Sequence, residues 1–271
     1  PKGIAVAVIG PEGPPALIAP DPHWSRTDVL DWLLHIAETQ QDMLIGFDLS
    51  MALPFFDQGS YFPEWDESPR DAKALWRQID RIARNDHHLN VTSFLEHQQA
   101  SRHFRHGQGR VGDLFTGGTG RFRQVEHYQR ETGQANSASC FNLVGAAQVG
   151  KSSLTGMRLL HRLDGAIPVW PFDPVPDHGP AIVEIYTTVA ALAAGQPKGR
   201  SKVRDRAGLK QALTHLNTSV PARLARYDDH STDALITAAW MKREAGNPAL
   251  WNPSALTDEI AQKEGWTFGV V

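Results

Sequence analysis

Short apolar segments alternate with helical patterns along the chain, and this order restricts the fold more than any other feature. An apolar run at 4–9, a Gly/Pro-rich turn at 10–15 and a second apolar run at 16–18 predict a β-hairpin. A helix from about Ser25 follows, and then a short strand at 43–48. The order strand, strand, helix, strand predicts an α/β or α+β domain with a mixed β-sheet.

The rest of the chain continues this alternation but contains one long irregular stretch. Further strands are predicted at 140–144, 166–172 and 181–186, and helices at 71–83, 152–163, 201–215 and 230–245. After the helix at 71–83 the periodicity is lost, and histidine and glycine become frequent. A long irregular stretch inside a compact domain is usually functional. We therefore predict one domain, 1–271, with a lid-like insertion at about 55–135.

Composition sets the class of protein. The chain has 271 residues, of which 41% are hydrophobic and 21% charged, and this excludes wholesale disorder. The single cysteine, Cys140, excludes an intrachain disulfide framework and favours a reducing compartment. No apolar run approaches the ~20 residues that a membrane span needs, and no signal segment is recognised at the start. We expect a cytoplasmic protein without membrane contact, and the sequence does not indicate its oligomeric state.

Charge is distributed unevenly, although the formal net charge is only -3. Residues 97–130 hold six arginines and two acidic residues, and residues 196–226 hold eight lysines or arginines and one acidic residue. Such basic segments on an acidic protein are typical of surfaces that bind phosphate groups, with Arg121, Arg123 and Lys202 as candidates. The simpler alternative is a solvated loop and a solvated helix face.

Residues 145–152 match the phosphate-loop pattern G-x-x-x-x-G-K-[ST] in full. In a nucleotide-binding NTPase, Gly145 and Gly150 would shape the loop, Lys151 would contact the outer phosphates and Ser152 would bind Mg²⁺. Such an enzyme also needs an acid at the end of another strand, and Glu184 fits that role poorly. We favour a glycine-rich turn between a strand and a helix and keep the NTPase as an alternative.

Four acidic residues form the main candidate site. Asp48 ends a strand, Glu184 belongs to another strand, and Asp229 and Asp233 share one face of a helix because they are four residues apart. If the four carboxylates converge, their repulsion requires a cation, as in phosphoryl-transfer sites that use Mg²⁺ or Mn²⁺. Each acid alone also has an ordinary structural role: a turn cap, a solvent-facing strand position, or a favourable charge at a helix start.

Several segments together resemble a family of ribonuclease-H-like predicted nucleases, the domain of unknown function 429. The resemblance rests on Ile45-Gly46-Phe47-Asp48 followed by Pro54, Val183-Glu184-Ile185-Tyr186, Asp228-Asp229-His230-Ser231-Thr232-Asp233-Ala234-Leu235, and Glu264-Gly265-Trp266-Thr267-Phe268-Gly269-Val270. It implies a five-stranded mixed sheet flanked by helices, with the acids gathered at its centre. It also implies that Lys151-Ser152 completes the phosphate-loop pattern by chance.

The resemblance leads to a functional hypothesis with one departure. We expect a metal-dependent nuclease or phosphodiesterase in which Asp48, Glu184, Asp229 and Asp233 are catalytic and bind Mg²⁺ or Mn²⁺, with nucleic acid as the partner. The fold normally places an essential Asp on its first strand, but residues 4–9 contain no acid. Either a preceding strand carries that Asp, or the protein is a non-catalytic nucleic-acid-binding relative; in both cases the chain as given is expected to lack full activity.

Overall fold

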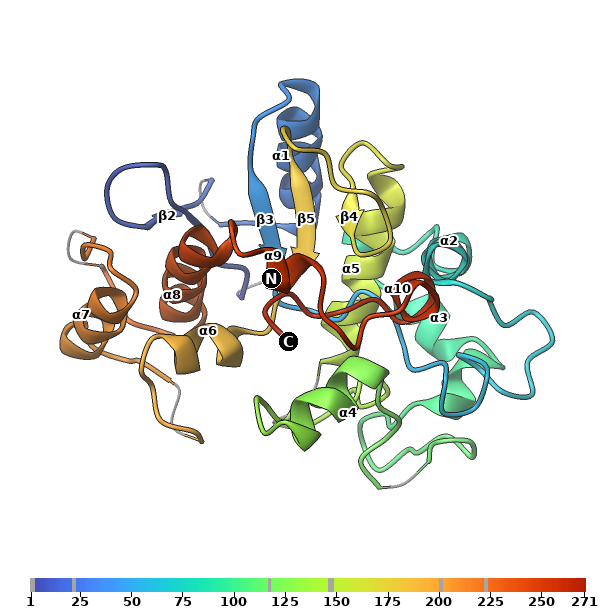
Figure 1. The fold of residues 1–271 in the computed structure, drawn as a ribbon. Coiled ribbons are helices and arrows are strands. Elements are labelled where there is room, and N and C mark those ends of the chain that lie inside the picture. Colours follow the sequence, from blue (N-terminus) through green and yellow to red (C-terminus); the bar gives the residue numbers. More distant parts are fainter. Residues whose placement is uncertain (1–2, 21–22, 117, 146–148, 200–201, 222–223) are drawn as a thin grey trace.

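A small parallel sheet forms the centre of the fold. The computed structural model describes residues 3–20, 23–116, 118–145, 149–199, 202–221 and 224–271 (Figure 1). The sheet has the order β3–β5–β4, and its strands are β3 at Leu44–Phe47, β5 at Ala181–Glu184 and β4 at Val169–Trp170. All three strands run parallel. The predicted α/β class is confirmed at this level.

The predicted hairpin is also confirmed, but it is separate from the parallel sheet. Strands β1 (Val6–Val8) and β2 (Ala16–Ile18) pair antiparallel, with Val6 opposite Ile18. Among the described residues they pair with no strand of the parallel sheet. Helix α8 (Asp229–Glu244) contacts both the hairpin and β3. The single mixed sheet predicted from the sequence is therefore replaced by an antiparallel pair and a three-stranded parallel sheet.

Both faces of the parallel sheet are buried, as is usual for parallel strands. Successive side chains of β5 point to opposite faces, so Ile182 joins one hydrophobic cluster and Val183 the other. The first cluster includes helices α1 (Arg26–Glu38), α2 (Ala72–Ile82) and α5 (Gly150–Arg162). The second includes α6 (Thr187–Ala193), α7 (Arg206–His215) and α8. In Figure 1 the sheet stands between these two groups.

Side-chain caps fix where the predicted helices begin. Ser25 accepts a hydrogen bond from the Asp28 N–H, and Asp28 accepts one from the Ser25 N–H, which completes a capping box at α1. Asp71 caps α2 through the Ala74 N–H at 2.8 Å. Helices at 71–83, 152–163 and 230–245 were expected, and α2, α5 and α8 confirm them within two residues at each end.

The stretch at about 55–135 packs as an integral part of the fold. Besides α2 it holds the short helices η1 (His87–Leu89), α3 (Thr92–Glu96), η2 (Ala100–His103) and α4 (Gln124–Glu131). Its rings Tyr61, Phe62, Phe94 and Phe104 are fully buried in the first hydrophobic cluster. The stretch predicted as a lid-like insertion thus contributes side chains to the core in this structure.

One predicted strand is absent from the described residues. Residues 140–144 are irregular and make a single bridge, between Asn142 and Arg105. Cys140, Phe141 and Leu143 are instead buried against the aromatic side chains of the first cluster. A short apolar run has the same sequence pattern whether it is a buried strand or an irregular segment packed against aromatic rings. This explains why the strand was predicted wrongly.

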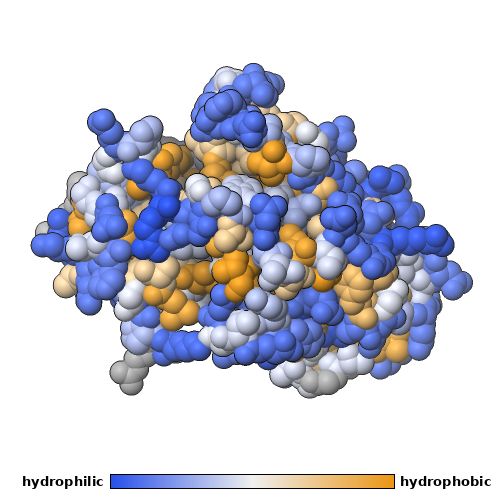
Figure 2. Space-filling view, viewed as in Figure 1, coloured by the Kyte–Doolittle hydropathy of each residue, from blue (hydrophilic) through white to orange (hydrophobic). Residues whose placement is uncertain are grey.

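The C-terminal segment closes the second hydrophobic cluster. It contains α9 (Pro248–Trp251) and α10 (Asp258–Lys263), and beyond them Thr267 bridges to Glu184 of β5. Among the described large hydrophobic residues only Val111 and Val271 are highly exposed. Figure 2 shows a mainly hydrophilic face in which hydrophobic residues form small groups. Among the described residues, no helix combines the length and the apolar character needed to cross a membrane.

Candidate functional site

Asp48 follows β3 at the carboxyl edge of the parallel sheet. Because Phe47 is paired with Glu184, the ends of β3 and β5 lie side by side. The Thr187 N–H, at the start of α6, donates to the Asp48 carboxylate at 3.4 Å. The carboxyl edge is where ligands bind in open parallel sheets. Asp48 is therefore in a suitable position for a functional side chain.

Helix α8 brings a second pair of carboxylates to this edge. Helix α8 packs closely on β3 at Gly46, where a Cβ atom would lie 2.5 Å from the Met241 sulfur. Asp228 caps α8 through the Ser231 N–H at 3.0 Å. Asp229 and Asp233 then project from the first turns of α8.

A basic segment is fixed beside the same helix. The buried Thr232 hydroxyl donates to the Val203 carbonyl at 2.8 Å, and this bond holds the segment against α8. The Lys202 ammonium forms an ion pair with Asp233. Arg204 binds Asp229 through two hydrogen bonds of 2.8 and 3.0 Å.

We call Asp48, Lys202, Asp229 and Asp233 the acidic cluster. Burial alone would lower the pKa of Lys202, but the ion pair with Asp233 and the nearby charges of Asp229 and Asp48 raise it. One ammonium group thus interacts with three carboxylates that come from two separate parts of the chain. The sequence predicts that these three acids converge and gives Lys202 only as a phosphate-contact candidate.

The carboxylates of the acidic cluster differ in their electrostatic surroundings. Asp48 reaches solvent but is densely surrounded by protein, and this desolvation, with repulsion from Asp233 and Glu184, raises its pKa to about 6. Desolvation also raises the pKa of Asp233. Hydrogen bonds from Arg204 lower the pKa of Asp229. Asp48 and Asp233 are therefore the members whose ionised form is most disfavoured by burial.

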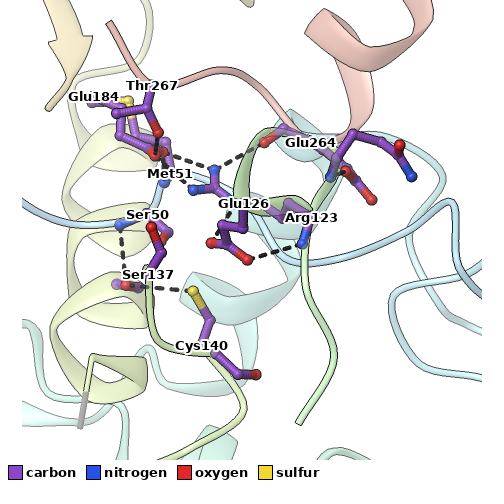
Figure 3. A network of polar contacts seen from close by, with 12 residues as sticks. Ser50, Met51, Arg123, Glu126, Ser137, Cys140, Glu184, Glu264 and Thr267 are labelled. Carbon is purple, nitrogen blue, oxygen red and sulfur yellow. Dashed lines mark hydrogen bonds and ion pairs between the residues drawn. The ribbon is translucent and has the colours of Figure 1, made fainter. Parts of the chain in front are cut away.

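Glu184 occupies a different environment. Its side chain is buried and accepts hydrogen bonds from both terminal nitrogens of Arg123, at 2.6 and 2.8 Å. The Met51 N–H and the Thr267 hydroxyl donate to the same carboxylate at 2.8 and 2.6 Å (Figure 3). With four donors already bound, the carboxylate has little capacity left for a cation. The geometry does not support the predicted role of Glu184 as a metal ligand.

The buried Arg123–Glu184 pair belongs to a larger network that sequence reasoning missed. Arg123 also binds Glu126 at 3.1 Å and the carbonyl of Glu264 at 3.0 Å. Burial raises the pKa of Glu126. The Glu264 carboxylate accepts three backbone N–H groups, from Phe55, Phe56 and Gln124, at 2.5, 2.9 and 2.6 Å. This network joins the stretch at about 55–135 to β5 and to the C-terminal segment.

The arginines suggested for phosphate contact divide into two groups. Arg121 and Arg123 are buried: Arg121 is paired with Asp57 and donates to three backbone carbonyls, including that of Tyr61 at 2.7 Å. Their role is structural, and this corrects the suggestion that they contact phosphate. Arg105 and Arg110 remain exposed in the same stretch.

The phosphate-loop alternative lacks its structural context. Residues 146–148 of the motif lie outside the described residues, and Gly145 has a φ of 85°. Gly150 and Lys151 open α5, and the Ser152 hydroxyl donates to the Val149 carbonyl at 2.8 Å. The motif needs a strand immediately before the loop, and the described part of residues 140–145 forms none. We do not pursue the NTPase reading.

No group of three or more histidine, cysteine, aspartate or glutamate side chains among the described residues is arranged to hold a metal ion by itself. A metal at the acidic cluster would therefore need ligands besides the protein. Comparison of the sequence and structure with models of protein families, with curated proteins and with solved structures gave no match.

Proposed function

We propose that this protein is a metal-dependent phosphodiesterase of ribonuclease-H-like fold that acts on nucleic acid. One observation carries the proposal: Lys202 forms an ion pair with Asp233 and also interacts electrostatically with Asp229 of the same helix and with Asp48, which is distant from both in the sequence. Buried or crowded like charges are costly, so such a group is usually retained for a chemical role. The resemblance of the segments around these residues to predicted nucleases supports the same assignment.

The donor chemistry of Asp48 and Asp233 suits Mg²⁺ or Mn²⁺. Both ions prefer oxygen ligands, and Mg²⁺ is commonly held by one or two carboxylates together with water and substrate phosphates. Asp48 and Asp233 supply two carboxylates whose pKa values are raised mainly by desolvation. A bound ion would stabilise charge on a phosphate oxygen and make a coordinated water more acidic. This pair fits a metal that completes its coordination with the substrate.

The remaining residues would position these two carboxylates and bind the substrate. Lys202 and Arg204 present positive charge next to the acids and would attract backbone phosphates. Glu184 is reassigned from ligand to positioning residue, because its bond to the Met51 N–H fixes the chain three residues after Asp48. Asp229, held by Arg204, would keep that guanidinium in place.

The cleavage assay compares the wild type with Asp48→Asn. Labelled single-stranded and branched DNA and RNA are incubated with Mn²⁺, with Mg²⁺ and with a chelator. We expect cleavage that needs the metal and falls at least about 100-fold in Asp48→Asn, since losing even outer partners of metal ligands costs about 10–100-fold. Asp66→Asn is the matched control, because Asp66 is exposed and lies outside the acidic cluster. Equal cleavage by the wild type and Asp48→Asn would remove Asp48 from the chemistry.

A second candidate function is nucleic-acid binding without turnover. It is favoured by the absence of any acid on β1 and by the ion pair between Lys202 and Asp233, which already compensates part of the negative charge. The same substrates separate the two functions. A non-catalytic binding protein would bind these nucleic acids with an affinity that falls steeply as the salt concentration rises. It would not cleave them in the presence of either metal ion.

A further inference from the structure

An open surface cavity of about 610 Å³ is lined mainly by polar and charged residues. It is bounded by the beginning of α1 and by the turn at 85–92 that contains η1 and leads into α3. None of its lining residues belongs to the acidic cluster or to the Arg123 network. Its volume lies in the range of sites that bind small molecules.

The cavity contains unpaired nitrogen groups. Arg26, Asn85, His87 and His88 line the cavity, and their side chains have no hydrogen bond or ion pair within the described part of the chain. Arg26 is partly buried, whereas Asn85, His87 and His88 are exposed to solvent. The Arg26 guanidinium is half-buried, and this burial lowers its pKa. A partly desolvated cation without a partner is unfavourable. An anion in the cavity would relieve that cost.

Acidic side chains at the cavity are directed to other donors. The Asp86 carboxylate accepts hydrogen bonds from the N–H and the hydroxyl of Ser93, at 2.8 and 2.5 Å. Asp28, next to Arg26 on α1, accepts the Ser25 N–H at 2.7 Å in the capping box. Neither carboxylate is hydrogen-bonded or ion-paired to Arg26 in the described structure. The positive potential of Arg26 is therefore left for a ligand.

The turn that carries the histidines is held rigidly. The buried guanidinium of Arg158 donates to the carbonyls of Asp86 and Asn90, at 3.0 and 2.6 Å, and is anchored by Asp80 at 2.8 Å. His88 and Leu89 both adopt left-handed backbone conformations, with φ of 54° and 53°. Two consecutive non-glycine residues in this region are strained, and the surrounding bonds must maintain them. The backbone that carries the two imidazoles is thus held in place beside the cavity.

We propose that this cavity binds a small oxyanion, specifically the phosphate group of a small molecule, through Arg26, His87 and His88. The guanidinium fork matches two phosphate oxygens, and imidazole N–H groups donate to the others. Asn85 supplies a further amide donor. This site is independent of the phosphodiesterase proposal and uses none of its residues.

The test is a titration of the full chain with inorganic phosphate. Binding is measured by calorimetry and by changes in the NMR signals of the histidine rings. Arg26→Gln removes the cation, and His88→Asn removes one imidazole while retaining a residue that tolerates a left-handed backbone. Arg84→Gln is the matched control, because Arg84 is exposed nearby and does not line the cavity. Thermal unfolding of each variant verifies that the fold is retained.

We expect saturable binding of one phosphate per chain, with shifts of the His87 and His88 ring signals. Affinity should fall about tenfold or more in Arg26→Gln, the loss of one charge-assisted hydrogen-bonding group, and several-fold in His88→Asn. Arg84→Gln should bind as the wild type does. The proposal is overturned by unsaturable binding to the wild type, by unchanged affinity in Arg26→Gln, or by equal losses in Arg26→Gln and Arg84→Gln.

Discussion

Replacing Arg123 with methionine is expected to lower the free energy of unfolding by about 3–5 kcal/mol at neutral pH. The side chain is 2% exposed, and its guanidinium pairs with both Glu184 and Glu126. Methionine fills similar volume but leaves two buried carboxylates without a positive partner. Denaturant unfolding measures the loss.

The control and the pH dependence identify the cause. Arg81→Met breaks an exposed ion pair with Glu67 and should cost no more than about 1 kcal/mol. Burial raises the pKa of Glu126 in the folded state, so its ionised form is less favourable there than in the unfolded chain. Ionisation of Glu126 therefore lowers the free energy of unfolding as pH rises. The decrease in the free energy of unfolding caused by Arg123→Met should therefore be smaller in mild acid than at neutral pH. The double variant Arg123→Met/Glu184→Gln should recover part of the lost stability. A loss in Arg123→Met no larger than that in Arg81→Met would contradict this account.

The second large effect is expected for Glu264→Ala, with a loss of about 3 kcal/mol or more in the free energy of unfolding. The fully buried carboxylate accepts three backbone N–H groups from two segments, and each buried donor left without a partner costs about 1–3 kcal/mol. Glu264→Gln keeps one acceptor oxygen, so its loss should be about half as large. Hydrogen exchange at Phe55, Phe56 and Gln124 should accelerate in the alanine variant.

A neighbouring glutamate provides the control for that experiment. Glu259→Ala removes an exposed carboxylate from α10, where it pairs with Lys263 one turn away. Such a helix-surface pair contributes only about 0.2–0.5 kcal/mol. If Glu264→Ala were as stable as Glu259→Ala, the three backbone bonds to Glu264 would not be holding these segments together.

Local rules explain the parts of the fold that could be predicted. The Gly/Pro-rich turn between two apolar runs indicated the β1–β2 hairpin, and local helix signals indicated α1, α2 and α8. Those signals lie within a few residues of one another. The pairing of strands across the chain has no such local signal, and so the separation of the hairpin from the parallel sheet was not predicted.

The candidate site was predictable only in part for the same reason. The i,i+4 spacing of Asp229 and Asp233 on α8 and the strand-end position of Asp48 are visible in the sequence. The pairing of Glu184 with Arg123 joins residues 61 positions apart, and nothing near either residue indicates it. Lys202 lay in a basic segment, but its ion pair with Asp233 depends on the buried bond between Thr232 and Val203.

Mn²⁺ binding measured by electron paramagnetic resonance tests the central claim most directly, namely that Asp48 and Asp233 together hold a divalent cation. We expect one site per chain in the wild type. Its affinity should rise between about pH 5 and about pH 7, because Asp48, with a pKa of about 6, must lose its proton to bind. Asp48→Asn and Asp233→Asn should each weaken binding at least about tenfold, and Asp66→Asn should not. Wild-type affinity in both cluster variants, or no binding by the wild type, would contradict the claim.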